Sequence, residues 1–388
     1  MNLTGTKLFF LVAAAMMLSS CKQDVQSSNK LSSAIIPLPK SILINKASCI
    51  FSSLKLNYPK ELNEEVSIFK NQLNCYFKNN IELFSENGMS VKLILLKDSS
   101  FINDYDLIIK RNEIEISANK SSGIFYGLQS FFQLMTLNSQ DQKFEVPCLI
   151  IKDKSAFEHR GFLLDCCRHF FDVSTIKKYI ELLSFYKMNV FHWHLTEDQG
   201  WRIEIDKYPL LNSIGSWRKD SSGTYGGYYS KKQIKDIIEY AKKRHIKVIP
   251  EIELPGHSQA AIAAYPHLSC NQQPVEVATD WGVFKEIYCA GNDSVFIFIE
   301  DILNEVTEIF PSKLIHIGGD EAPKFRWENC SKCQKRMKEE NLKNEHELQS
   351  YFIERVANIL SKKKRTIIGW DEILESEISI PAIVQSWR

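Results

Sequence analysis

The sequence lacks an excess of either charge. Its 48 lysines and arginines are matched by 47 aspartates and glutamates, which gives a formal net charge of +1 over 388 residues. Proteins that bind nucleic acid through its phosphates carry a marked basic excess, so we expect no nucleic-acid partner. The balance suits a neutral substrate, or one that needs only local charges. Hydrophobic residues at 44% and charged residues at 24% are ordinary for a soluble globular protein.

Apolar runs long enough to span a membrane are also missing. The run over residues 8–18, which follows Lys7, has the length of a signal-peptide core and is too short to cross a bilayer. The Leu-Ser-Ser-Cys motif that ends at Cys21 resembles a bacterial lipobox, in which the cysteine is lipidated; an ordinary secretory signal with a chance cysteine is the alternative. We predict a signal peptide over residues 1–21, a polar tether over residues 22–34, and an exported protein anchored by lipid to a bacterial membrane, in the periplasm or at the cell surface.

A second C-x-x-C pair is absent. Because only Cys330 and Cys333 have this spacing, the sequence does not support a four-cysteine zinc site, and a small local disulfide or plain thiols are the favoured interpretations. We expect no metal and no cofactor. An exported chain meets oxidising conditions, so we predict a disulfide between Cys270 and Cys289, which lie in one long connection between two predicted strands.

The pattern over residues 35–150 predicts a small α+β unit. Two short strands, residues 105–109 and 113–116, flank a polar turn. An apolar-rich helix over residues 123–134 follows, opened by Ser122. No polar cluster in this unit resembles a catalytic site, so we interpret it as an accessory domain.

Residues 151–388 alternate short apolar strands with amphipathic helices, which predicts an α/β fold with parallel strands inside and helices outside. Without a Gly-rich phosphate loop, the pattern favours a (β/α)8 TIM barrel over a doubly wound sheet. A closed barrel of this type needs eight strands and about six precede Arg388, so we expect the C-terminal part of the barrel to be missing. The predicted strands are 161–166, 189–195, 247–254, 314–318, 366–370 and 382–387, and the predicted helices are 174–186, 231–244, 294–310 and 345–363, with Ser230 and Asp293 as N-caps.

Carboxylates, histidines and tryptophans are concentrated at the carboxyl ends of these strands, where the active groups of such barrels lie. Indole rings pack on the apolar faces of sugars, and carboxylates bond to sugar hydroxyls. Glycosidic cleavage needs an acid for the leaving oxygen and a group that stabilises the developing charge. Asp320 and Glu321 can divide these roles. Because adjacent residues on an extended chain point in different directions, the pair fits an acid with a helper better than an acid with a protein nucleophile.

His192 and His194 have the i, i+2 spacing that places both side chains on one face of a strand. They can form a metal pair, as in barrel metallohydrolases. The favoured alternative is a pair of buried histidines bonded to carboxylates.

Five sequence blocks within residues 151–388, taken together and in order, resemble glycoside hydrolase family 20, the β-N-acetylhexosaminidases. The block His316–Glu321 resembles the catalytic signature of that family, and residues 123–129 resemble its accessory N-terminal domain. The other matching blocks are His159–Asp165, Arg168–Phe170, His192–Arg202 and Pro250–His257.

The resemblance implies an exo-acting enzyme that hydrolyses terminal non-reducing N-acetyl-D-hexosamine residues from glycans by a substrate-assisted, retaining mechanism. The 2-acetamido oxygen of the substrate would attack the anomeric carbon. Glu321 would protonate the leaving oxygen and later deprotonate water, while Asp320 would orient the acetamido group. The resemblance also implies that Arg160 would bind sugar hydroxyls and that Asp198 and His257 would form a relay that tunes the pKa of Glu321. Trp370 and Trp387 would line the acetamido group and the faces of the sugar ring.

Two functions of other classes stay open. One is a non-catalytic, surface glycan-binding lipoprotein on a decayed barrel; the presence of both Asp320 and Glu321 argues against it, and the missing strands argue for it. The other is a metal-dependent hydrolase that uses His192 and His194.

Overall fold

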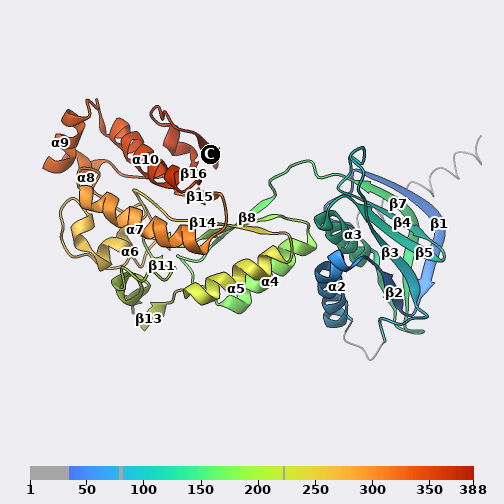
Figure 1. The fold of residues 1–388 in the computed structure, drawn as a ribbon. Helices are drawn as coiled ribbons and strands as arrows, with labels where there is room; N and C mark the ends of the chain where they lie inside the picture. Colours follow the sequence, from blue (N-terminus) through green and yellow to red (C-terminus); the bar gives the residue numbers. More distant parts are fainter. Residues whose placement is uncertain (1–34, 78–81, 222) are drawn as a thin grey trace, which may run out of the picture. The chain divides into compact units, whose positions relative to one another are not determined.

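A computed structural model describes residues 35–77, 82–221 and 223–388 (Figure 1). The chain divides after Glu158 into two compact units, with Ser184–Lys187 belonging to the first. The predicted signal peptide, the tether and Cys21 lie outside the described residues. Within the part that is described, no helix is both long enough and apolar enough to cross a membrane.

The first unit is a seven-stranded mixed sheet with two helices on one face (Figure 1). The predicted hairpin is confirmed: strands β4 (Tyr105–Lys110) and β5 (Glu113–Ala118) pair antiparallel and leave a two-residue turn between them. Helix α3 (Ser121–Leu134) begins one residue before the predicted Ser122 and packs its apolar side on these strands. The other elements are β1 (Ser41–Phe51), β2 (Leu54–Asn57), α2 (Asn63–Tyr76), β3 (Met89–Leu95), β6 (Thr136–Asn138) and β7 (Lys143–Asp153), in the sheet order β1-β7-β4-β5-β3-β2 with β6 on β7.

The second unit is built on a six-stranded parallel sheet, and all six predicted strands are present. Their order across the sheet follows their order in the chain, which is the topology of a (β/α) barrel; a doubly wound sheet reverses direction at a switch point. The central strands are buried and apolar, as strands covered on both faces are, whereas the first and the last strand of the sheet are largely exposed. The strands are β8 (Gly161–Asp165), β9 (Val190–His194), β14 (Lys247–Glu251), β15 (Leu314–His316), β16 (Thr366–Trp370) and β17 (Ala382–Gln385).

The four predicted helices of this unit are also found, each within two residues of its expected ends. They are α4 (Val173–Phe185), α5 (Lys231–Lys242), α7 (Asp293–Ile309) and α10 (Glu345–Lys362). Short elements lie in the loops between them: α6 (Gln259–Ala264), α8 (Phe325–Glu328), α9 (Ser331–Glu339), and the small hairpins β10–β11 (Thr196–Glu197 with Gly200–Trp201) and β12–β13 (Trp217–Asp220 with Gly223–Gly226).

One of the two predicted N-caps is correct. Ser230 caps α5 in a reciprocal capping box with Gln233, whose side chain accepts from the Ser230 N–H. Asp293 is not a cap: Asn292 has the extended backbone of the N-cap position, and its side chain accepts from the N–H of Ser294 at 3.2 Å. Asp293 is instead the first helical residue.

Along the strands of the second unit, the side chains of one face form first an apolar layer and then, two residues further, a polar layer. Val190, Ile249 and Ile368 pack against one another as a small cluster of inward-facing side chains. Two residues further along the same strands, the same face carries polar groups, among them His192 and Glu251, which lie in contact. The carboxyl ends of the strands therefore open onto a buried polar layer.

Candidate active site

The centre of this polar layer is one carboxylate, Glu251, at the end of β14. Its oxygens lie 2.9 Å from Nε2 of His192, 3.0 Å from Nδ1 of His194 and 2.8 Å from Nδ1 of His316. The indole N–H of Trp370 donates to it at 3.0 Å. Burial raises the pKa of the Glu251 carboxyl, but the three histidines outweigh burial and hold it well below its usual range. Both His192 and His194 are therefore in contact with a buried carboxylate, as the favoured interpretation of this pair predicted.

A second histidine centre connects loops that follow three different strands. Nδ1 of His257 lies 2.8 Å from Glu197 and 3.3 Å from Asp198, while its Nε2 lies 3.5 Å from Asp320 and 3.6 Å from Glu321. The structure thus brings together four of the residues singled out from the sequence. Burial lowers the pKa of His257, but hydrogen bonds with Asp198, Asp320 and Glu197 raise it well above its usual value. The charged imidazolium is therefore the favoured form.

The pKa values of the two carboxylates behind His257 are shifted in opposite directions. Burial raises the pKa of Glu197, but hydrogen bonds with His194 and His257 outweigh burial and lower it to about 2. Burial raises the pKa of Asp198; His257 lowers it in part, and the charge of Glu197 raises it again. Sequence analysis assigned no role to Glu197. Its position beside Asp198, directly after a strand that carries two histidines, is the signal that could have identified it.

The segment that carries Asp320 and Glu321 has unusual backbone geometry. Gly318 and Gly319 have φ of +66° and +96°, and Glu321 has φ of +44°, a left-handed conformation that non-glycine residues rarely adopt. A Cβ on Gly318 would lie 1.6 Å from a carboxyl oxygen of Glu253. The two glycines therefore allow the turn that presents the acidic pair, and the strained Glu321 is typical of a functional position.

Glu253 is a buried acid that sequence analysis did not single out. Its side chain lies next to Gly318, and its backbone N–H donates to Oγ1 of Thr196 at 2.7 Å. Burial, and then the charges of Asp320 and Glu251, raise its pKa well above the usual value. The neutral carboxylic acid is the favoured form. A charged residue type inside an apolar strand pattern is the sequence signal for such a group.

Glu321 and Trp387 lie on the wall of one open pocket, together with Glu372 and Glu375. The indole N–H of Trp387 donates to Glu372, with its nitrogen 3.1 Å from the nearer oxygen. This arrangement holds an exposed indole beside the proposed acid, as a surface for an apolar sugar face requires.

Two other predicted substrate contacts, Trp370 and Arg160, are not among the residues that line this pocket. Trp370 belongs to the layer around Glu251, where its ring lies 4.9 Å from that of His316, measured between centroids. Arg160 directly precedes β8, and its backbone oxygen accepts from the N–H groups of Asn189 and Val190. Its backbone is therefore at the amino end of the strand, opposite to the end that carries Asp165.

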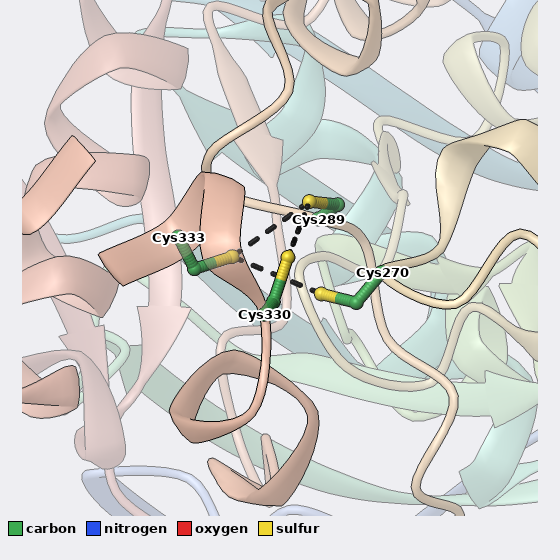
Figure 2. Close-up of side chains that lie close together, drawn as sticks. All are labelled: Cys270, Cys289, Cys330 and Cys333. Carbon is green, nitrogen blue, oxygen red and sulfur yellow. Dashed lines mark hydrogen bonds between the residues drawn. The ribbon is translucent and has the colours of Figure 1, made fainter. Parts of the chain in front are cut away.

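The predicted disulfide between Cys270 and Cys289 is not formed, and both residues are free cysteines. They belong to a cluster with Cys330 and Cys333 (Figure 2). The sequence did not support a four-cysteine site because Cys330 and Cys333 form its one C-x-x-C pair. The fold supplies the third and fourth cysteines from a different loop.

Comparison with known proteins agrees with this arrangement. Residues 157–388 match the model of the glycosyl hydrolase family 20 catalytic domain, and residues 32–154 match domain 2 of the same family. A β-hexosaminidase of Porphyromonas gingivalis is 50% identical over 290 residues, which cover 73% of this chain and 37% of that protein. A β-hexosaminidase of Akkermansia muciniphila is 36% identical over 288 residues, 73% of this chain and 58% of that protein.

Solved structures give the same result. The GH20 exo-β-N-acetylglucosaminidase of Vibrio harveyi, in complex with N-acetylglucosamine, superposes with a TM-score of 0.82 at 30% identity, over 92% of this chain and 58% of that one. The β-N-acetylhexosaminidase of Bacteroides fragilis gives a TM-score of 0.78 at 35% identity, over 91% and 70%. The chain thus spans between about a third and about two thirds of the length of these relatives. With both family models matched along its length, the chain belongs to glycosyl hydrolase family 20.

Proposed function

We propose that the protein is an exo-acting β-N-acetylhexosaminidase that hydrolyses terminal non-reducing N-acetylhexosamine residues from glycans. The relatives named β-hexosaminidase, and the related exo-enzyme solved with N-acetylglucosamine, support this substrate class. The observation that carries the proposal is the adjacent pair Asp320 and Glu321, each within 3.6 Å of the same buried histidine nitrogen.

The pair fits substrate-assisted cleavage because its two carboxylates have different surroundings. Glu321 faces the open pocket, where it protonates the glycosidic oxygen while the 2-acetamido oxygen of the substrate attacks the anomeric carbon. The leaving alcohol departs, and an oxazolinium forms. Glu321 then takes a proton from water, which opens the oxazolinium with net retention. Asp320, which is less exposed, orients the acetamido group and balances its positive charge.

His257 acts through these two carboxylates as a positioning residue. Its charged ring, held on the far side by Glu197 and Asp198, places a positive charge behind Asp320 and Glu321. It therefore fixes the positions of the two carboxylates beside the pocket.

Replacement of Glu321 by glutamine tests the proposal. We expect kcat on a substrate with a poor leaving group to fall about 10²–10⁴-fold, and to fall less on an activated aryl glycoside, whose leaving group needs little protonation. Glu328→Gln makes the same chemical change at an exposed position outside this pocket and is expected to leave kcat near the wild-type value. Equal losses on both substrates would contradict the role of Glu321 as the acid. If the wild type binds the substrate without turnover, a glycan-binding protein is favoured instead.

Asp320→Asn tests substrate assistance. We expect a large loss on substrates that carry a 2-acetamido group, and we expect plain glucosides to be poor substrates of the wild type. Efficient hydrolysis of a plain glucoside would contradict the mechanism.

We also propose that the protein is exported and anchored to a bacterial membrane through a lipid on Cys21. The support is the lipobox-like motif directly after the apolar run over residues 8–18. Cys21→Ser should move the protein from the membrane fraction to the soluble fraction and abolish labelling by a fatty-acid analogue. An unchanged distribution would contradict the anchor.

A further inference from the structure

The four-cysteine cluster has no part in the proposed reaction. Cys270 and Cys289 lie in the long connection between β14 and α7; Cys330 is the N-cap of α9, and Cys333 lies in its first turn. Figure 2 shows the four sulfurs pointing toward a common centre. All four lie within 4.8 Å of one another. From its geometry we infer that this cluster is a structural zinc site, with Cys270, Cys289, Cys330 and Cys333 as the four ligands.

The spacing of the sulfurs is the first argument. The distances are 3.8 Å for Cys270–Cys333, 3.8 Å for Cys289–Cys330 and 3.7 Å for Cys289–Cys333. In a tetrahedral site with Zn–S bonds of about 2.3 Å, neighbouring sulfurs lie about 3.8 Å apart. A disulfide would bring two of them to about 2.05 Å. Cys289 is almost equally far from two other sulfurs, as a corner of a tetrahedron is and a member of one S–S pair is not.

The surroundings of the sulfurs are those of a thiolate site. Cys289 and Cys333 are buried, and a four-sulfur tetrahedral donor set is selective for zinc or iron. Cys330 and Cys333 begin a helix, where free N–H groups stabilise negative charge. The backbone N–H of Gly291 donates to the sulfur of Cys289. A backbone N–H directed at a ligand sulfur is a usual outer contact of a metal–thiolate site.

Close packing fixes the two halves of the cluster against each other. A Cβ on Gly291 would lie 2.2 Å from the carbonyl carbon of Lys332 and 2.4 Å from the backbone nitrogen of Cys333. The indole N–H of Trp327 donates to the Tyr288 oxygen at 2.9 Å. The site is therefore built from two backbone segments in direct contact, although about forty residues separate them in the chain.

The position of the cluster gives it a structural role near the pocket. Between Cys270 and Cys289, the loop passes over the residues behind His257: the N–H of Ala278 donates to the Asp198 oxygen at 3.1 Å, and Gln199 donates to the Asp280 oxygen at 2.8 Å. The other two cysteines follow the segment that carries Glu321. A metal bound here links the two loops that carry and support the acidic pair.

Metal analysis of the purified protein tests the inference independently of activity. We expect one zinc per chain, all four thiols resistant to alkylation in the native state, and all four alkylated after denaturation with a chelator and without a reductant. Replacement by cobalt should give the absorption of a tetrahedral cobalt–thiolate centre. A protein without metal, or any disulfide among the four cysteines in non-reducing peptide maps, would overturn the site.

A pair of variants completes the test. Cys333→Ser should lose the zinc, whereas Cys75→Ser, at an exposed cysteine far from the cluster in sequence, should retain it. If Cys333→Ser does not fold, the metal and alkylation measurements on the wild type still decide the matter. Full zinc content in a folded Cys333→Ser protein would exclude Cys333 as a ligand and overturn the site as proposed.

Discussion

Gly318 shows how one missing side chain shapes the acidic pair. The position has φ of +66°, and an added Cβ would collide with the Glu253 carboxyl group. Two costs are therefore expected on substitution: a backbone cost of about 1–3 kcal/mol and a steric cost that depends on Glu253. Gly319, with φ of +96°, has a similar backbone cost, but its added Cβ would meet Ile373 and not Glu253.

Because the steric part of the cost depends on Glu253, we expect the effects of substitutions at Gly318 and Glu253 on stability to be coupled. Gly318→Ala should destabilise the protein, and the double variant Gly318→Ala, Glu253→Ala should be more stable than the sum of the two single losses by about 0.5–3 kcal/mol. Gly319→Ala combined with Glu253→Ala should be additive. Urea unfolding of the single and double variants measures both cycles. Additivity at Gly318 would show that the collision is relieved by movement of the backbone.

Glu253 itself should weaken the protein as the pH rises. Its pKa in the folded protein lies above the ordinary value of 4.5. Below pH 4.5, the group is protonated in both states and has no effect. At higher pH the unfolded chain ionises while the folded protein does not, so stability falls until the folded pKa is reached. The charge that the fold excludes is thus a cost at neutral pH.

Glu253→Gln removes this titration while keeping the shape of the neutral acid. We expect the variant to melt a few degrees above the wild type at pH 7, with the difference vanishing near pH 4. Thermal melts across this range provide the measurement, with Glu375→Gln as the surface control. A difference that does not change with pH would mean that Glu253 is ionised in the folded protein.

At the level of elements, the sequence predicted what depends on local patterns. Each buried strand of the second unit is an apolar run, and the longer helices have a clear apolar periodicity, so both were located within a few residues. The short helix α9 and the β10–β11 hairpin were missed because two to nine residues contain too few periods.

The acidic pair and its histidine were predictable for a topological reason. Parallel strands that follow one another around a barrel bring their carboxyl ends to one side, so polar residues after β9, β14 and β15 were bound to meet. The cysteine cluster was not predictable in this way. Its members meet because two loops pack together, and the spacing along the chain does not encode that contact.

The capping box of α5 is an element whose contribution can be measured. The Ser230 side chain accepts from the Gln233 N–H at 3.2 Å, and Gln233 accepts in return from the Ser230 N–H at 2.8 Å. Ser230→Ala should cost about 1 kcal/mol of stability, while Ser230→Asp, which can still cap, should cost much less. Denaturant unfolding compares the two. Equal losses would mean that the hydroxyl group stabilises some contact other than the helix end.

At the scale of the whole molecule, the two units differ in whether their ionised groups with shifted pKa values are buried or on the surface. Each unit has its own hydrophobic core. The second contains buried ionised groups, among them Glu197, Glu251 and His257. In the first, the carboxylates with lowered pKa values, such as Glu86, are on the surface, where ion pairs contribute little. The two units should therefore respond differently to acid.

Glu197 sets the direction of that response. Its pKa is about 2 in the folded protein against an ordinary value of 4.5. The stability that it contributes is fully present above pH 4.5 and is lost as the pH falls toward 2, because the unfolded chain takes up the proton first. We therefore expect amide hydrogen exchange, corrected for the intrinsic rate at each pH, to show residues 188–388 losing protection below pH 4.5 while residues 35–158 change little.

Glu197→Gln should lower protection in residues 188–388 at pH 6, since Arg168 and His257 lose a charged partner. The difference in protection between this variant and the wild type should disappear as the pH falls. Glu86→Gln, in the first unit, should leave both regions unchanged. A gap that stays constant down to pH 3 would show that Glu197 contributes by packing alone and that acid weakens the barrel unit through other groups.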